Sequence, residues 1–205
     1  QHSLGHQYEV LFNGVETDRC AAARPWETTG PTIFFVGRHE PRKGLDVLLD
    51  AMNELPADLT LWVASDGPQT EALKARSAGD ARIKWLGRIS EEEKLSRMKG
   101  ADIFCAPSLR GESFGVVLLE GMACDTTVVA SDIPGYAKVA QEGQHAVLVP
   151  PGDSTALATA IEKTLHDPQR AAQLRASGLQ RAHQFSMKQL AQRYLTVYQE
   201  VIDDA

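Results

Sequence analysis

The chain has 205 residues, which is long enough to bury a substantial core in one α/β domain, or in one domain with an appendage. Apolar residues make up 43% of it and charged residues 23%, as is ordinary for a globular protein. The net charge of −6 and the isoelectric point near 5.5 argue against a protein that binds nucleic acid by bulk electrostatics, although they leave room for a local cationic pocket.

From Thr32 onward, short apolar runs alternate with amphipathic segments, which is the pattern of βαβ units in a parallel sheet. The apolar runs predict six strands, at residues 32–37, 59–64, 82–87, 102–107, 127–131 and 145–150. Helical spacing predicts helices at 43–55, at 69–77, after Ser90, at 115–123 and after Pro134. We therefore expect an α/β fold with a doubly wound, mostly parallel, six-stranded Rossmann-like sheet and helices on both faces. Ligands of such sheets bind at the carboxyl ends of the strands.

The beginnings and ends of several helices are marked in the sequence. Ser90 and Glu93 form a capping box, which predicts a helix start after Ser90. From Asp153 to its end the chain has a helical pattern, broken near Pro168 and Ser186. The domain therefore ends in a helical tail.

The cysteines and the start of the chain favour a reducing compartment and a segment of a longer protein. Three cysteines without CxxC spacing indicate neither a disulfide framework nor a zinc site, so we expect a reducing compartment. Cys105 and Cys124 lie in apolar runs and are expected in the core. No apolar run approaches the ~18 residues of a membrane span, and there is no signal peptide. The chain starts without Met, like the interior of a longer protein.

The loop after the first predicted strand, "GRHEPRKG", is cationic. It places Arg38, Arg42 and Lys43 at the carboxyl end of a strand, just before a helix. Cations at this position suit a diphosphate, which needs charge neutralisation and directed donors. The alternative is a basic, solvated turn. The loop is not a P-loop, because the chain has no GxxxxGK[ST].

The stretch "RGESFGVVLLEGMA" places two glutamates eight residues apart, with Gly111 and Gly115 around the first. The helix that begins near Phe114 would offer free backbone N–H groups to an anion at the same sheet edge. Glu120 would then lie about 7.5 Å along the helix, close to the distance of a ribose from its diphosphate. Glu112, before the helix, would accept hydroxyls of a sugar. The alternative is a surface helix with a solvated glutamate.

Other positions carry weaker signals. Ile89 follows the third strand and lines a base pocket or packs in the core. Asp66 belongs to a turn, "SDGP", and is expected to be structural. None of the six histidines has the spacing of a catalytic or metal-binding residue.

Taken together, the motifs resemble those of a known family. They are "NGVE", "VGRHEPRKGLDVLLDA", "WLGRISEEEK", "ADIFCAPSLRGESFGVVLLEGMA", "VVASDIPG" and "AVLVPPGD". Over residues 13–202 the chain resembles the carboxyl-terminal, donor-binding half of retaining glycosyltransferases with the GT-B fold, in the glycogen-synthase-like group 1 superfamily. Within it, "EPRKG" and "CAPSLRGESFGVVLLEGMA" look most like phosphatidylinositol mannosyltransferases, which use GDP-mannose. The resemblance makes residues 1–30 an interdomain-junction segment and residues 31–205 the donor-binding domain with its helical tail.

The resemblance also implies residue roles. Arg38 and Lys43 would bind the donor diphosphate. Glu112 would lie near the transferred sugar as the first glutamate of the E-x7-E motif, and Glu120 would bind the ribose as the second. The turn at Phe114, Gly115 and Val116 would present backbone to phosphate and sugar, and Ile89 would contact the base. Glu112, Arg38 and Lys43 would be the catalytic set.

The implied activity is transfer of mannose from GDP-mannose to a lipid or glycan acceptor, by front-face attack with retention of configuration. No DxD-like motif suggests a metal, and no cofactor is expected. The partners would be the nucleotide-sugar and an amino-terminal acceptor domain, without which this domain would be inactive; nucleic acid is not expected. The full-length protein would be cytoplasmic, at the periphery of the membrane. Alternatives are a hexosyltransferase using a UDP- or ADP-sugar and a non-catalytic nucleotide-sugar-binding module. A dinucleotide oxidoreductase is disfavoured, because no GxGxxG follows the first strand.

The chain departs from the family pattern at three places. Asp125 and Thr127 stand where the family usually has Gly and often Pro, so we expect a reshaped helix terminus there. Ser65 replaces a glycine that often lies close to the nucleotide. The amino-terminal acceptor domain is absent from this chain.

Overall fold

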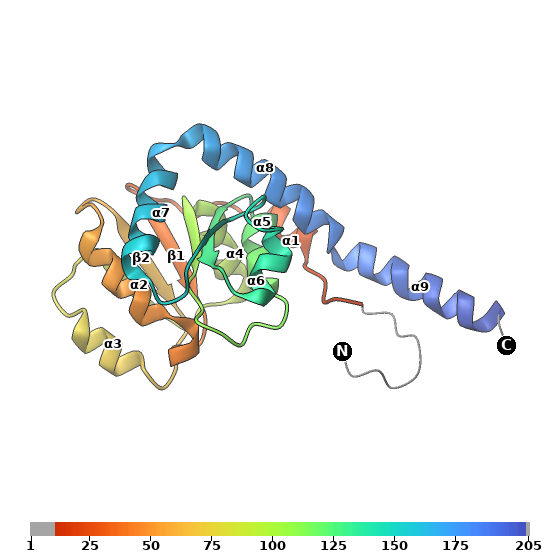
Figure 1. Ribbon diagram of the computed structural model, residues 1–205, viewed down its shortest axis with the longest axis horizontal. Helices are drawn as coiled ribbons and strands as arrows, with labels where there is room; N and C mark the ends of the chain where they lie inside the picture. Colours follow the sequence, from red (N-terminus) through yellow and green to blue (C-terminus); the bar gives the residue numbers. More distant parts are fainter. Residues whose placement is uncertain (1–10, 204–205) are drawn as a thin grey trace.

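The computed structural model describes residues 11–203 as a three-layer α/β domain (Figure 1). The strands are β1 Thr32–Val36, β2 Thr60–Ala64, β3 Ile83–Gly87, β4 Ile103–Ala106, β5 Thr127–Ser131 and β6 Val147–Val149. They form one six-stranded sheet in the order β3-β2-β1-β4-β5-β6, and each neighbouring pair is parallel. The predicted doubly wound sheet is confirmed. The strand order reverses between β1 and β4, where such sheets bind ligands.

Helices connect the strands and cover both faces of the sheet. They are α1 Thr17–Ala22, α2 Leu45–Ala51, α3 Thr70–Arg76, α4 Glu91–Gly100, α5 Val116–Ala123, α6 Pro134–Ala140, α7 Ser154–His166, α8 Pro168–Gln184 and α9 Met187–Asp203, with 3-10 turns η1 Pro41–Lys43 and η2 Met52–Glu54. Successive residues of a strand face opposite helical layers. In β1, Phe34 joins a core with residues of α4, α5 and α6, whereas Ile33 and Phe35 join a core with α2 and α7.

The helix predicted at 43–55 is divided in the structure. It begins as the 3-10 turn η1, continues as α2 only from Leu45, and ends in η2. The break lies at Gly44, whose backbone is left-handed (φ 66°) and lies so close to the β4 loop that a Cβ would meet the Pro107 carbonyl oxygen at 2.0 Å. This contact ties the cationic loop after β1 to the loop after β4.

The expectation of a reshaped terminus at Asp125 is wrong. Asp125 adopts the left-handed conformation itself (φ 60°), and Asp125 N donates to the Met122 carbonyl while Thr126 N donates to the Gly121 carbonyl. These two bonds form a Schellman motif, so the helix ends in the regular way with aspartate at the left-handed position. Ser65 likewise keeps a left-handed backbone (φ 83°).

Residues 11–30 contact Ser186, between α8 and α9, and the end of α5, whereas the first ten residues of the predicted junction segment lie outside the described residues. Val15 pairs with Ser186 in a parallel bridge, and Cys20 of α1 is buried together with Cys124 at the end of α5. Cys105 and Cys124 are core residues, as predicted, and all three cysteines are free. Directly after Ser186, α9 begins; it has no buried residue and extends away from the sheet (Figure 1).

Candidate functional site

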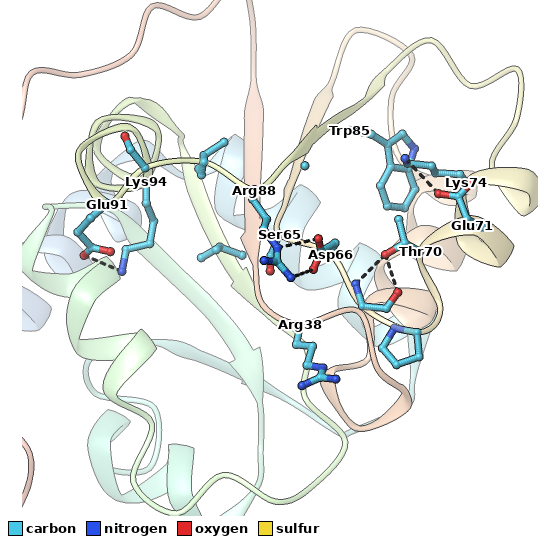
Figure 2. A pocket seen from close by; sticks show the side chains of 16 residues that line it. Arg38, Ser65, Asp66, Thr70, Glu71, Lys74, Trp85, Arg88, Glu91 and Lys94 are labelled. Carbon is cyan, nitrogen blue, oxygen red and sulfur yellow. Dashed lines mark hydrogen bonds and ion pairs between the residues drawn. The ribbon is translucent and has the colours of Figure 1, made fainter.

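The carboxyl ends of β1, β2 and β3 open on a cavity of about 960 Å³ (Figure 2). Three loops line it: Arg38 follows β1, residues 65–68 and Thr70 follow β2, and residues 88–91 follow β3. Because parallel strands end at the same edge, their loops meet there. Of the residues predicted for the donor site, the cavity is lined by Arg38 and Ile89.

Glu120 does not line this cavity itself, but it forms an ion pair with Lys94, which does. Lys94 Nζ is 3.1 Å from Glu120 Oε1 and 2.8 Å from Glu91 Oε1, and both Lys94 and Glu91 line the cavity. Burial lowers the pKa of Lys94, but the two carboxylates outweigh it and hold that pKa above its usual value. Glu120 and Glu91 therefore face a cation that remains charged at neutral pH.

A second ion pair lies across the cavity, between the loops after β2 and β3. Arg88 Nε and Nη2 donate to the two carboxylate oxygens of Asp66 at 2.8 and 3.1 Å. The hydrogen bonds from Arg88 hold the pKa of Asp66 below its usual value. The pair is exposed, both residues line the cavity, and the ion pair joins the turn at Asp66 to the loop after β3.

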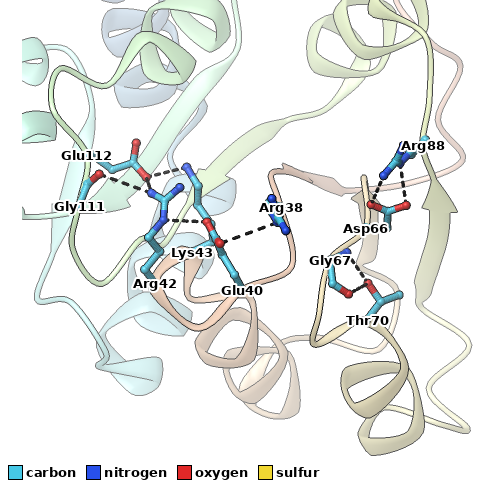
Figure 3. Close-up of polar contacts among 10 residues, drawn as sticks. All are labelled: Arg38, Glu40, Arg42, Lys43, Asp66, Gly67, Thr70, Arg88, Gly111 and Glu112. Carbon is cyan, nitrogen blue, oxygen red and sulfur yellow. Dashed lines mark hydrogen bonds and ion pairs between the residues drawn. The ribbon is translucent and has the colours of Figure 1, made fainter.

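Glu112 is the centre of a separate polar cluster at the ends of β1 and β4 (Figure 3). Its Oε1 accepts from Lys43 Nζ at 2.6 Å, from Arg42 Nη1 at 3.1 Å and from Ser108 Oγ at 3.2 Å. Both Lys43 and Glu112 are mostly buried, with side-chain exposures of 18% and 13%. The structure thus brings together Glu112 and Lys43, two of the three predicted catalytic residues.

Arg38, the third, is not part of this cluster. Its side chain is 67% exposed and its nearest carboxylate is Glu40, at 3.9 Å. Arg42, which bonds to both Glu40 and Glu112, occupies the place next to Lys43. Figure 3 shows Arg38 between the Glu112 cluster and the Asp66–Arg88 pair, so its exposed guanidinium lies between the two parts of the site.

The turn before α5 presents backbone at the same edge of the sheet. Gly115 is the N-cap with a left-handed backbone (φ 81°) and no side chain caps the helix, so its first N–H groups are open to an anion. The Phe114 side chain does not take part, because it is buried in an aromatic cluster. Its ring centroid lies 4.4 Å from that of Phe12, on which it stacks, and 5.2 Å from that of Phe185. Phe114 can therefore contribute only its backbone.

Comparison with known proteins assigns this arrangement to a family. The family model of group 1 glycosyl transferases matches residues 18–181. This chain belongs to the group 1 glycosyltransferases.

Named relatives agree with this assignment. The glycosyltransferase chain is 36% identical over 207 residues to a phosphatidyl-myo-inositol mannosyltransferase of Mycobacterium leprae, covering 97% of this chain and 55% of that protein. It is 33% identical over 192 residues to a GDP-mannose-dependent alpha-(1-6)-phosphatidylinositol monomannoside mannosyltransferase of Mycolicibacterium smegmatis, covering 83% and 50% of the two chains. Its fold matches that of a sucrose-phosphate synthase from Thermosynechococcus elongatus with a TM-score of 0.83 and 27% identity, covering 96% and 53%. The chain thus spans about half the length of these relatives.

The sequence did not identify several polar residues of this glycosyltransferase site. They are Arg88, Glu91 and Lys94, which line the cavity, Ser108, which donates to Glu112, and Tyr136, whose hydroxyl contacts Ser108. Arg88 to Lys94 lie in the stretch "GRISEEEK", whose position after a strand was the one available signal. Nothing in the sequence marks Tyr136, which reaches the site from α6 by tertiary packing.

Residues 11–203 contain no group of three or more histidine, cysteine or acidic side chains placed to hold a metal ion. No helix within this range is both long and apolar enough to cross a bilayer. His2 and His6 lie outside the described residues.

His39 joins two of the cavity loops and gives the fold a pH dependence. It is fully buried, its ring contacts Thr70 Oγ1 at 2.9 Å and the Ala64 carbonyl at 3.3 Å, and burial lowers its pKa despite the nearby Asp66. Because the unfolded chain then takes up the proton first, the free energy of unfolding should fall as the pH drops below about 6.5. We expect a His39→Gln variant to lose much of this decrease in urea titrations between pH 7 and 5.

His145 is the necessary comparison, because burial and Arg181 lower its pKa as well. The His145→Gln variant should lose only its own share of the pH dependence. A His39→Gln variant that destabilises with acid as steeply as the parent would contradict the assignment.

Proposed function

We propose that this chain is the donor-binding half of a retaining mannosyltransferase that uses GDP-mannose and needs no metal or other cofactor. The observation that carries the proposal is the pairing of Glu112 with Lys43 and Arg42 beside the uncapped start of α5. Cations and open N–H groups at one sheet edge suit a diphosphate, and a carboxylate among them suits the hydroxyls of the attached sugar. Both named mannosyltransferase relatives match over most of this chain.

The donor would lie along the carboxyl edge of the sheet. The diphosphate would bind at the N-terminus of α5, with Lys43 on one side and the exposed Arg38 on the other. Glu120 would accept from the ribose, and the base would enter the cavity beside Ile89, which is half-buried there. Glu112 would hold the mannose.

These residues would assist departure of the diphosphate. As the bond between sugar and phosphate breaks with oxocarbenium-like character, negative charge grows on the leaving diphosphate. Lys43, Arg38 and the N–H groups of Val116 and its neighbour would stabilise that charge. An acceptor hydroxyl attacking from the same face would form the new glycosidic bond and pass its proton to the departing diphosphate oxygen, which retains the configuration without a covalent intermediate on the protein.

The acceptor would be bound by a second half of the protein. The curated relatives are about twice as long as this chain, and two of them are named for lipid acceptors. α9 exposes Leu195, Val201 and Ile202 to more than 60% each, an apolar surface that a second domain would cover. In the full-length protein we expect action at the cytoplasmic face of a membrane and no transfer by this half alone.

Isothermal titration of this chain with GDP, UDP, ADP and GDP-mannose, with and without magnesium, tests the proposal. We expect micromolar binding of GDP and GDP-mannose, weaker binding of UDP and ADP, and no effect of magnesium. Preference for UDP or ADP would mean that the donor is a UDP- or ADP-hexose and not GDP-mannose. Binding of donors without any transfer by the full-length protein would instead identify a nucleotide-sugar-binding module.

A further inference from the structure

Tyr136 of α6 and Ser108 after β4 are buried polar residues that contact Glu112 from the interior. Their exposed fractions are 1% and 2%. Tyr136 Oη lies 3.0 Å from Ser108 Oγ, and Ser108 Oγ lies 3.2 Å from Glu112 Oε1. The three side chains form a chain of hydrogen bonds from the core to the site.

The directions of these bonds follow from the chemistry of the groups. An ionised carboxylate only accepts, so the single Ser108 hydroxyl proton is donated to Glu112. Ser108 Oγ must then accept from Tyr136, whose hydroxyl is the donor. Burial raises the pKa of Tyr136, so the phenol keeps its proton over the whole working range of pH.

All of the bonds to Glu112 fall on one of its oxygens. Oε1 accepts from Lys43, Arg42 and Ser108, whereas Oε2 accepts from none of the described residues. Figure 3 shows the Oε1 side turned toward the two cations. Oε2 is therefore the oxygen left for a ligand.

We propose that Tyr136 and Ser108 are positioning residues that fix the Glu112 carboxylate so that Oε2 accepts hydroxyls of the donor sugar; this inference rests on the proposed function. Lys43 and Arg42 cannot do this alone, because the bound diphosphate would compete with Glu112 for Lys43, and the Arg42 side chain is 40% exposed. The neutral pair Ser108–Tyr136 is buried and cannot reach the phosphates. It remains on Oε1 when the donor binds.

Paired titrations of this chain with GDP-mannose and GDP test the inference. The variants Tyr136→Phe and Ser108→Ala should each bind GDP-mannose about fivefold more weakly, and GDP within about twofold of the parent. Because the bonds act in series, the double variant should be no worse than Ser108→Ala. Tyr198→Phe, a matched change at an exposed tyrosine of α9, should alter neither affinity.

The outcomes separate the inference from the proposed function. Equal weakening of both ligands would indicate a merely structural role for Tyr136, and unchanged affinities would show no role; either result overturns the inference. If UDP-glucose and UDP bind the parent in place of the guanosine pair, the mannose proposal fails and the same comparison is made with them. If no donor binds, the proposed function fails. Crystal structures of the ligand-free parent and of Tyr136→Phe then test whether Tyr136 positions Glu112. An identical Glu112 rotamer in both would then overturn the inference, and a shifted one would support it.

Discussion

A Lys43→Met variant is expected to bind GDP at least about tenfold more weakly than the parent, because a charge-assisted bond to phosphate contributes about 1.5–3 kcal/mol. Lys43 is held at the site before any ligand arrives, since its Nζ lies 2.6 Å from Glu112 and its side chain is only 18% exposed. Little side-chain entropy therefore remains to be lost on binding. Titrations with GDP at low and at physiological salt measure the effect.

Two further variants decide whether the loss comes from the cation at the diphosphate. Glu112→Gln removes the negative charge that neutralises Lys43. It should leave GDP binding unchanged or tighter, whereas Lys43→Met weakens it. Lys138→Met removes an exposed lysine of α6 and should have no effect. Parent-like binding of GDP by Lys43→Met, or weakening by Lys138→Met of the same size, would contradict the assignment of Lys43.

The layered fold could be predicted because it depends on local patterns. Each strand is a short apolar run in which successive residues, such as Ile33 and Phe34, pack into the cores on opposite faces of the sheet. A run that is apolar at every position therefore indicates a sheet covered by helices on both faces. Ser90 Oγ accepts from Glu93 N, as the capping box predicted. The helix α1 was not predicted, because its six residues have no capping side chain and too few apolar positions to show a period.

The sequence predicted where the site residues lie, but not which of them form ion pairs with one another. A loop after a parallel strand must lie at the carboxyl edge, so Lys43, Glu112 and Ile89 could be placed there from sequence. Which cation meets which carboxylate depends on contacts between residues about 70 positions apart, and Arg42 rather than Arg38 pairs with Glu112 because Gly44 docks the loop against Pro107. The sequence carries no local signal for such a contact.

The turn at Gly115 gives the second large expected effect, on stability. A Gly115→Ala variant is expected to lower the free energy of unfolding by about 2–4 kcal/mol, from a left-handed backbone and an overpacked contact together. At φ 81° an L-residue is strained, and a Cβ would meet Tyr136 Cδ1 at 2.8 Å. Tyr136 is fully buried and cannot move aside without shifting α6. Urea unfolding followed by circular dichroism measures the loss.

A Gly79→Ala variant separates the two causes. Gly79 also has a positive φ, 96°, but a Cβ there would meet nothing within 4 Å, so its substitution adds strain of about 1–2 kcal/mol without a clash. The excess destabilisation of Gly115→Ala is then the contact with the Tyr136 ring. Equal losses in the two variants would mean that the ring yields freely, and that α6 does not fix the turn whose N–H groups face the diphosphate. A clear excess would show that the ring of Tyr136 packs firmly against this turn and, with α6, fixes its position.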